Sequence, residues 1–403
     1  MVFSSLNFRG RCVKQEGLEP FDLRLDAYRT GLRHHATWAV HAPDGSTTRA
    51  EFDVEVYDLE HVLELSNKVI RRIEFLVEKT DFRMEALSDP DLLKCLGELN
   101  AELYTKRVAE DRTNLREIFA GLLATRPKPS IIVGGVMRLI PWELTTPDAM
   151  TGVAGMLGSR ALIVGSTGGE PRRNPDGLAV YRPKRRLNMV GVGDDIRVRA
   201  IGNMALAGAA QEAAMATQPG KRASGVIAPV LQAGDSKKPF FDHFPIEGYD
   251  LVHVFAHCDY RSSAFRLGVS DSVDVTRHDF NDHDVRFPSR AFHFLNVCRA
   301  APTAGRREYA IVDYLAVQQD AGGVVAPLTS VRSKAAVSMA SEFYARFLPP
   351  AADAFGSSAA EAISGARDAL SARGEATGYL YRAFGRHDLV LGPVDKIVEA
   401  ENV

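Results

Sequence analysis

Apolar and polar residues alternate in two stretches near the start of the chain, from Phe21 to Ala27 and from Ala50 to Val56. A period of two predicts strands with one face toward water, and the turn signal Pro43-Asp44-Gly45 before the second stretch favours an antiparallel arrangement. Two amphipathic stripes with the period of a helix follow, from Val62 to Leu76 and from Leu115 to Leu122. The first part of the chain therefore predicts a small α+β module.

A proline-rich break, Arg126-Pro127-Lys128-Pro129-Ser130, follows the second stripe. Proline removes an amide donor and biases the residue before it away from the helical region. We therefore expect a domain boundary here, with the α+β module over residues 1–126 and a second domain over residues 131–403. The length of 403 residues is enough for roughly two or three domains.

Beyond the break, short continuous apolar runs are separated by helical patterns or loops. Such runs are typical of buried parallel strands, and their order predicts an α/β domain with a mostly parallel sheet covered on both faces. The runs are Ile131–Val133, Leu187–Val192, Val226–Leu231, Leu251–Ala256, Phe292–Val297, Val324–Leu328 and Leu389–Leu391. Helical stripes from Val337 to Phe347 and from Ile363 to Leu370 come near the end of the chain, and residues 166–186 have the Gly, Pro and Arg content of an exposed loop.

The composition is that of an ordinary soluble globular protein, with 45% hydrophobic and 25% charged residues. No stretch has the length and hydrophobicity of a membrane span, and residues 1–13 lack the apolar core of a secretory signal, so we expect a cytoplasmic protein. A formal net charge of -2 gives no reason to expect nucleic acid or a membrane as the main partner.

The cysteines and histidines show no arrangement typical of a disulfide framework or a metal site. Cys12, Cys95, Cys258 and Cys298 have no CxxC spacing, which fits a compartment where thiols stay reduced. His253 and His257 have HxxxH spacing, but they lie in a strand-like run and no HExxH glutamate is present. We therefore expect no metal.

A thiol and an imidazole each follow one of the apolar runs. His257 comes after Leu251–Ala256, and Cys298 comes after Phe292–Val297. In open parallel sheets the chemistry collects at the carboxyl ends of the strands, so we expect the two side chains next to each other, as a cysteine nucleophile and its base require. A lone histidine or a buried free cysteine is more often structural. Cys258 is a competing thiol, but it directly follows His257 and would point away from it.

Six short segments of the second domain occur in a characteristic order and spacing. They are Ile140–Leu144, Leu251–His257, Phe294–Arg299, Ala321–Leu328, Glu342–Tyr344 and Ala362–Arg367. Together they resemble the CHAT peptidases of the caspase-like clan of cysteine proteases, over most of residues 131–393. The resemblance implies a caspase-like α/β/α sandwich with Cys298 as the nucleophile and His257 as the general base or acid. It also implies an oxyanion hole made by the backbone amides of Cys258 and Cys298, although the family usually carries glycine where Cys258 stands.

The leading hypothesis from these residues is a cysteine endopeptidase that cleaves a protein partner and needs no metal or organic cofactor. The resemblance adds a regulated bacterial signalling or defence system, with a protein activator or sensor and with residues 1–126 as the regulatory or partner-binding module. Asp194 and Asp195 follow the run Leu187–Val192, where caspase-like peptidases often have an acidic residue for a basic P1 side chain.

Two other function classes stay open. A catalytically decayed caspase-like interaction module is the main alternative, because Cys258 replaces the usual glycine. A nucleotide-binding α/β protein is weaker, since Gly191 and Gly193 follow a strand-like run without a complete phosphate-binding fingerprint.

Overall fold

The computed structural model of the chain describes most of the residues between Phe21 and Pro393. The described ranges are 21–30, 33–41, 47–54, 56–105, 115–147, 152–166, 172–173, 179–180, 189–192, 196–203, 206, 208–211, 214, 223–227, 237–241, 251–261, 264–269, 273–282, 291–304, 310–315, 321–348, 354–385 and 390–393. They form two compact units. The first contains residues 1–72, 87–186 and 303–305, and the second contains residues 73–86, 187–302 and 306–403.

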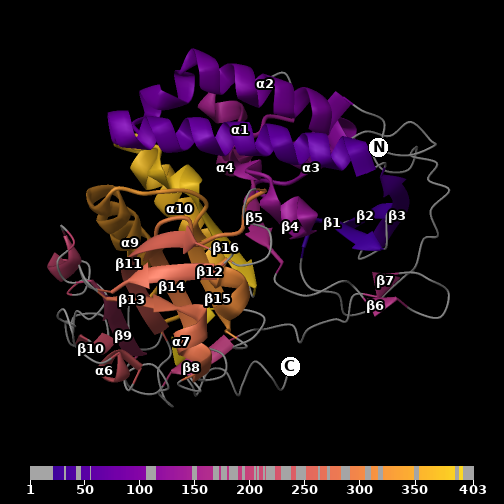
Figure 1. Cartoon of the computed structure of the whole chain (residues 1–403). Helices are drawn as coiled ribbons and strands as arrows, with labels where there is room; N and C mark the ends of the chain where they lie inside the picture. Colours follow the sequence, from indigo (N-terminus) through magenta and orange to yellow (C-terminus); the bar gives the residue numbers. More distant parts are fainter. Residues whose placement is uncertain are drawn as a thin grey trace. The chain divides into compact units, whose positions relative to one another are not determined.

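The first unit is built on five strands with long helices after the third (Figure 1). The strands are β1 (Leu23–Thr30), β2 (Arg33–His41), β3 (Thr47–Val54), β4 (Ser130–Gly135) and β5 (Leu162–Gly165). They lie in the order β5-β4-β1-β2-β3, with β1, β2 and β3 antiparallel and with β4 parallel to both β1 and β5. The helices are α1 (Val56–Thr80), α2 (Pro90–Thr105), α3 (Leu115–Thr125) and the single turn α4 (Leu157–Arg160).

Short elements complete the first unit. They are the 3-10 turns Val136–Leu139, Trp142–Leu144 and Val153–Gly155, and the antiparallel pair β6 (Arg172–Arg173) and β7 (Ala179–Val180). Trp142 is fully buried, stacks on Phe119 at 6.0 Å and donates a hydrogen bond from Nε1 to the carbonyl oxygen of Met137 at 2.7 Å. A buried indole needs such a partner for its N–H, so Trp142 is an anchor of the core.

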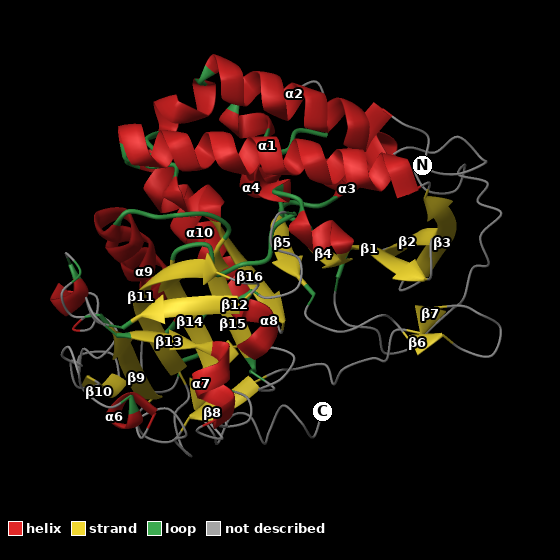
Figure 2. Cartoon of the chain, in the orientation of Figure 1, coloured by secondary structure: helices red, strands yellow, loops and turns green. Residues whose placement is uncertain are grey.

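The second unit contains a mostly parallel sheet that includes the apolar runs at Leu251–Ala256, Phe292–Val297 and Val324–Leu328 (Figure 2). Its strands are β8 (Met189–Val192), β9 (Ile196–Gly202), β10 (Ala223–Ile227), β11 (Leu251–Arg261), β12 (Ala264–Gly268), β13 (Asp274–Thr276), β14 (Phe292–Val297), β15 (Gly323–Pro327), β16 (Tyr381–Gly385) and β17 (Val390–Pro393). The order β10-β9-β11-β14-β15-β16 is parallel except for β16, which is antiparallel to β15. β12 and β13 extend β11 as an antiparallel meander, and β8 pairs with β17 separately.

The helices of this unit are α6 (Lys238–Phe241), α7 (Arg277–Asp282), α8 (Ile311–Asp313), α9 (Ser333–Phe347) and α10 (Ala359–Ala372), with 3-10 turns at Met84–Ser88 and Thr377–Leu380. α10 begins with a capping box. Ser358 accepts a hydrogen bond from the amide of Glu361, whose carboxylate accepts one from the amide of Ser358. Reciprocal capping of this kind satisfies amides that the first helical turn leaves open.

One face of the central strands packs against α9. Phe292 and Phe294 of β14 contact Phe343, with ring centroids 5.9 and 4.8 Å apart, and Phe292 also lies 4.5 Å from Phe347. Burying each such ring stabilises the unit by about 1.5–3 kcal/mol relative to leaving it exposed. The even-numbered residues of β14 therefore face α9, and this face leads directly to Cys298.

The predicted α/β architecture with a mostly parallel sheet is confirmed, with one difference beside the site. The apolar run Leu251–Ala256 was expected to end at a turn after His257, but β11 continues to Arg261. The reason is that the polar residues at the end of β11 pair with β12. This pairing supplies backbone hydrogen bonds, so the strand continues beyond its buried part. Near the start of the chain, Val56 begins α1 and does not end the strand before it. Among the described residues no helix combines the length and apolar content needed to span a membrane.

Candidate active site

His257 and Cys298 continue a row of paired residues on adjacent parallel strands. The register of β11 and β14 runs from Leu251 opposite Phe292 to Ala256 opposite Val297, so the next position on each strand is His257 and Cys298. Residues opposite each other in a sheet project to the same face. His257, inside β11, and Cys298, in the turn that follows β14, therefore come directly after the last paired residues of two adjacent parallel strands.

That face is the one covered by α9. His253, four residues before His257 on β11, is fully buried, with Nδ1 2.6 Å from the hydroxyl of Tyr344 and its ring stacked on Phe294 at 5.4 Å. Since side chains alternate along a strand, His257 lies on the same face as His253, and Cys298 on the same face as Phe294. His253 is thus a core residue, while His257 is exposed at the sheet edge.

The turn that carries Cys298 is fastened to the segment after β15. Cys298 is half-buried, with Sγ 3.6 Å from the carbonyl oxygen of Val331. The amide of Arg299 donates to the carbonyl oxygen of Thr329 at 3.0 Å, and the amide of Ala301 donates to that of Pro327 at 3.1 Å. These contacts hold the thiol at a defined position next to the start of α9.

Arg299 adds two features to this turn. Its φ of 60° lies in the left-handed region, which non-glycine residues rarely adopt. Its Nε donates to Oε1 of Glu74 at 2.8 Å, and Glu74 lies in the part of α1 that belongs to the second unit. The residue after Cys298 is therefore held both by its backbone and by an ion pair.

Asn296 is a buried polar residue that the sequence argument did not single out. Its Nδ2 donates to the carbonyl oxygen of Ala336 in α9 at 3.0 Å, and its Oδ1 accepts from the hydroxyl of Tyr381 in β16 at 2.7 Å. Two residues before Cys298, it joins β14 to a helix and to another strand. The signal in the sequence was an amide inside a run of otherwise apolar residues, where a buried polar group requires partners.

Cys258 lies on the opposite face of β11 from His257, because consecutive strand residues alternate. It pairs with Leu267 of β12, and its Sγ is 3.8 Å from the carbonyl oxygen of Asp259. Its φ is not among the positive values of the described residues, so the backbone there is one that any residue adopts. A cysteine at this position therefore causes no left-handed strain.

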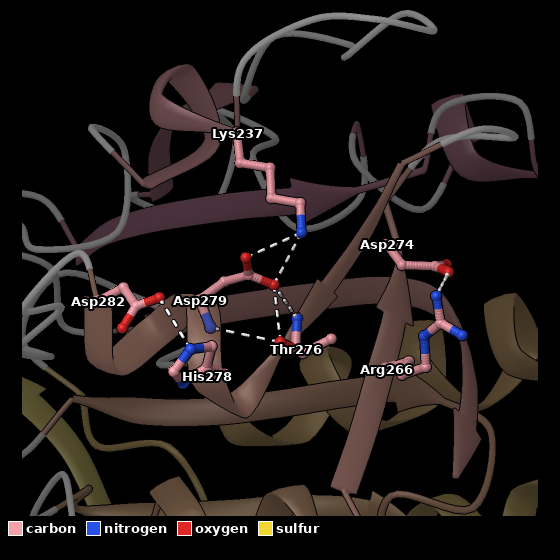
Figure 3. A network of polar contacts seen from close by, with 7 residues as sticks. All are labelled: Lys237, Arg266, Asp274, Thr276, His278, Asp279 and Asp282. Atoms are coloured by element: carbon pink, nitrogen blue, oxygen red, sulfur yellow. Dashed lines mark hydrogen bonds and ion pairs between the residues drawn. The ribbon is translucent and has the colours of Figure 1, made fainter. Parts of the chain in front are cut away.

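A network of charged residues extends from the β12–β13 pair to α7, and Figure 3 shows it from close by. Lys237 donates to both carboxylate oxygens of Asp279 at 2.8 and 2.9 Å, and the amide and hydroxyl of Thr276 donate to Oδ2 at 2.8 and 2.7 Å. Burial acts to raise the pKa of Asp279, but the hydrogen bonds from Lys237 and Thr276 outweigh burial and lower it. This network caps α7 and fastens Lys237, which precedes α6, to it.

The structure says less about the remaining residues that the sequence analysis named. Asp194 and Asp195 lie outside the described residues, as does Cys12. The strand before the two aspartates, β8, pairs with β17. Within the described part of the chain no three His, Cys, Asp or Glu side chains come together as a metal site.

Comparison with solved structures gives the fold class. The chain is similar to separase of Saccharomyces cerevisiae in two crystal structures of its complex with securin, with TM-scores of 0.51 and 0.50 and 11% identity in both. The matches cover 92% and 93% of this chain and 30% of the separase chain. The chain has the fold of the caspase-like cysteine peptidases. It spans only 30% of the length of the separase chains that it matches.

A second solved structure is similar at a lower TM-score. The Arg-specific gingipain R (RgpB), from Porphyromonas gingivalis, matches with a TM-score of 0.39 and 10% identity, over 81% of this chain and 75% of the gingipain chain. No family model matches the sequence, and no curated protein matches it. At these identities the separase comparison shows the fold alone, and any assignment of activity depends on the geometry of His257 and Cys298.

Proposed function

We propose that the chain is a cysteine endopeptidase that cleaves a protein partner with Cys298 as the nucleophile and His257 as its acid and base. One observation supports the proposal: β11 and β14 are adjacent parallel strands paired up to Ala256 and Val297, and His257 and Cys298 are the next residues along the chain. The caspase-like fold supports it, because chemistry in open α/β sheets collects at this edge.

The reaction would proceed through a covalent acyl-enzyme. The Cys298 thiolate attacks the carbonyl carbon of the scissile peptide bond and forms a carbon–sulfur bond, and the carbonyl oxygen becomes an oxyanion. The backbone amides of Cys258 and Cys298 are the proposed donors to that oxyanion. As the tetrahedral intermediate collapses, the carbon–nitrogen bond breaks and protonated His257 gives its proton to the leaving amine.

Hydrolysis then returns the enzyme to its starting state. His257, now neutral, takes a proton from water as the water attacks the thioester carbon, and the carbon–sulfur bond breaks to release the acid and the Cys298 thiolate. No metal or organic cofactor takes part. The contact of Sγ with the carbonyl oxygen of Val331 is one that a thiol can make and a thiolate cannot, so forming the nucleophile releases it.

The proposed biology rests on resemblance to the CHAT peptidases. It consists of a regulated bacterial signalling or defence system, a protein activator or sensor, and a regulatory or partner-binding role for residues 1–126. Separase was crystallised in a complex with securin, a protein partner, which supports regulation by a protein in this case too. We also propose that Asp194 or Asp195 binds a basic P1 side chain.

The test is proteolysis by variants of the full chain. Cys298→Ala and His257→Ala should each abolish cleavage of a protein substrate and leave the unfolding midpoint nearly unchanged, because His257 is exposed and Cys298 is half-buried after its strand. Cys258→Ala is the matched control and should retain activity. Cleavage that survives Cys298→Ala but is lost in Cys258→Ala would show that the assignment is wrong.

The alternative is an interaction module with the same fold and no activity. Labelling with an electrophilic thiol probe separates the two, and the structure provides the comparison. Cys95, Cys258 and Cys298 are all half-buried free thiols, so different labelling rates reflect reactivity more than access. A catalytic Cys298 should react fastest, and faster in the wild type than in His257→Ala. Equal rates at the three cysteines would favour the interaction module.

A further inference from the structure

The row that contains Cys298 and His257 continues onto two further strands. His257 is paired with Gly268 of β12, and Gly268 is paired with Asp274 of β13. Directly opposed residues of antiparallel strands project to the same face. An imidazole, a glycine and a carboxylate thus follow one another across three adjacent strands on one face, and the thiol of Cys298 comes directly after the neighbouring strand β14.

Gly268 leaves space between the imidazole and the carboxylate. A Cβ built on Gly268 would have as its three nearest atoms Cβ of His257 at 3.4 Å, Oδ1 of Asp274 at 3.7 Å and the backbone oxygen of His257 at 3.9 Å. All three belong to the two residues that flank the glycine. The volume above Gly268 that a side chain would occupy, which we call the Gly268 space, is therefore bordered by His257 on one side and Asp274 on the other.

Each flanking residue presents a polar group that no described residue uses. Asp274 is held through Oδ2, which accepts from Nη2 of Arg266 at 2.6 Å (Figure 3), while Oδ1 faces the Gly268 space. Among the described residues, none forms a hydrogen bond or ion pair with the His257 ring. Cβ is the side-chain atom of His257 nearest to the Gly268 space, and of the two ring nitrogens Nδ1 is the one closer to Cβ along the side chain.

We propose that Asp274 is a positioning residue for His257. Its Oδ1 accepts a hydrogen bond from His257 Nδ1–H through one water molecule in the Gly268 space. A bridging water spans roughly 5 Å between two polar atoms, which suits a pair too far apart for a direct bond. The link fixes the tautomer that keeps Nε2 free to exchange a proton with Cys298. Gly268 is required because a larger side chain would fill the space.

This role deepens the proposed peptidase function and rests on it for its catalytic meaning. Asp274 does not touch the reacting atoms. Among the residues whose side chains are described, the charged or titratable groups on this face near His257 include His253 and Asp259 of β11, Arg266 of β12, Asp274 of β13 and Cys298 after β14. Among these carboxylates, Asp274 borders the Gly268 space, while Asp259 is opposite Arg266 in the register.

The tautomer of His257 can be measured whether or not the chain cleaves anything. We would label the full chain with ¹⁵N-histidine, assign the His257 imidazole by its loss in His257→Gln, and compare wild type with Asp274→Ala and Gly268→Ala. The second variant fills the space without removing a charge, and the φ of Gly268 is not in the left-handed region, so alanine fits the strand. Asp282→Ala is the matched control, since Asp282 pairs with His278 on α7 and is also exposed (Figure 3).

In wild type and Asp282→Ala we expect the neutral ring of His257 to carry its proton mainly on Nδ1. In Asp274→Ala and Gly268→Ala the proton should shift toward Nε2. In both variants kcat/KM for Cys298-dependent cleavage should fall about tenfold, which is a part of the rate enhancement that a positioned acid and base contributes. An unchanged tautomer in Asp274→Ala overturns the inference, even if cleavage depends on Cys298. A shift in Asp274→Ala but not in Gly268→Ala overturns the water link. If both variants shift the tautomer but no protein is cleaved, the positioning role holds and the peptidase function fails.

Discussion

Acidification should destabilise the chain through His293, a residue of β14 on the face opposite to Cys298. Its ring is fully buried, and Nδ1 lies 3.1 Å from the carbonyl oxygen of Ala291. Desolvation lowers the pKa of His293 from 6.5 to about 4, although the hydrogen bond to Ala291 acts in the opposite direction. The unfolded chain therefore binds a proton near pH 6.5 that the folded chain does not bind until about pH 4.

The sign and size of the effect follow from this difference. Between these two pH values the unfolded state holds more protons, so the free energy of unfolding is highest above pH 6.5 and falls as the pH is lowered. One such group lowers the free energy of unfolding by about 2 kcal/mol at pH 5 and by about 3 kcal/mol at pH 4, relative to its value above pH 6.5. Asp279 and Glu342 also have lowered pKa values. Their contributions are lost only as the pH falls below their ordinary values of 3.8 and 4.5, outside most of this window.

The assay is urea unfolding of the full chain at pH 7.5, 6 and 5. His293→Gln should lose less stability between pH 7.5 and 5 than wild type, by about 2 kcal/mol. His278→Gln is the control, because His278 is exposed, with 83% of its side chain accessible, and should keep the wild-type slope. Equal slopes for wild type and His293→Gln would refute the reasoning, whatever the absolute stability of the variant.

Two further predictions concern the surroundings of the proposed dyad. Tyr381→Phe removes the buried hydroxyl that donates to Asn296. The free energy of unfolding in urea should fall by about 1–3 kcal/mol, and kcat should fall as well. Unchanged stability would contradict a supporting role for this bond. Asp194→Asn and Asp195→Asn, assayed separately on peptides with Arg, Lys, Leu or Asp at P1, should include one variant that loses a preference for a basic P1 by on the order of a hundredfold in kcat/KM. A wild-type enzyme that cleaves after Leu as well as after Arg would contradict a role of either aspartate in binding a basic P1 side chain.

The sheet could be predicted from the sequence because its central strands are buried on both faces. A strand in that position must be apolar at nearly every residue, and the runs at Leu251–Ala256 and Phe292–Val297 became β11 and β14. The helix α2 was missed although its buried residues Leu92, Leu96 and Leu99 have the same period as those of α1. The division at Arg126 stays a prediction. β1, from before this break, pairs in parallel with β4, from after it.

The neighbourhood of the proposed site was harder to predict than the positions of His257 and Cys298. These two residues come directly after the paired parts of adjacent parallel strands, and a parallel register brings such positions together whatever the loops do. The row from His257 to Asp274 depends instead on the register of two antiparallel pairings. A shift of one residue in either pairing would place the side chains of the shifted strand on the other face. The bond between Asn296 and Tyr381 joins residues 85 positions apart, and no local pattern indicates such a pair.

The turn after Cys298 allows a test of its backbone by two substitutions at one position. Arg299 has a φ of 60°, which costs a non-glycine residue roughly 1–2 kcal/mol, whereas glycine adopts it freely. Arg299→Ala and Arg299→Gly both lose the contact with Glu74, so that loss cancels when the two variants are compared. Glycine should be the more stable of the two by about 1 kcal/mol in urea unfolding, the reverse of the order expected in an ordinary strand or helix. If alanine is as stable as glycine, the turn does not hold the residue after Cys298 in the left-handed region, and the geometry inferred for the nucleophile loses its support.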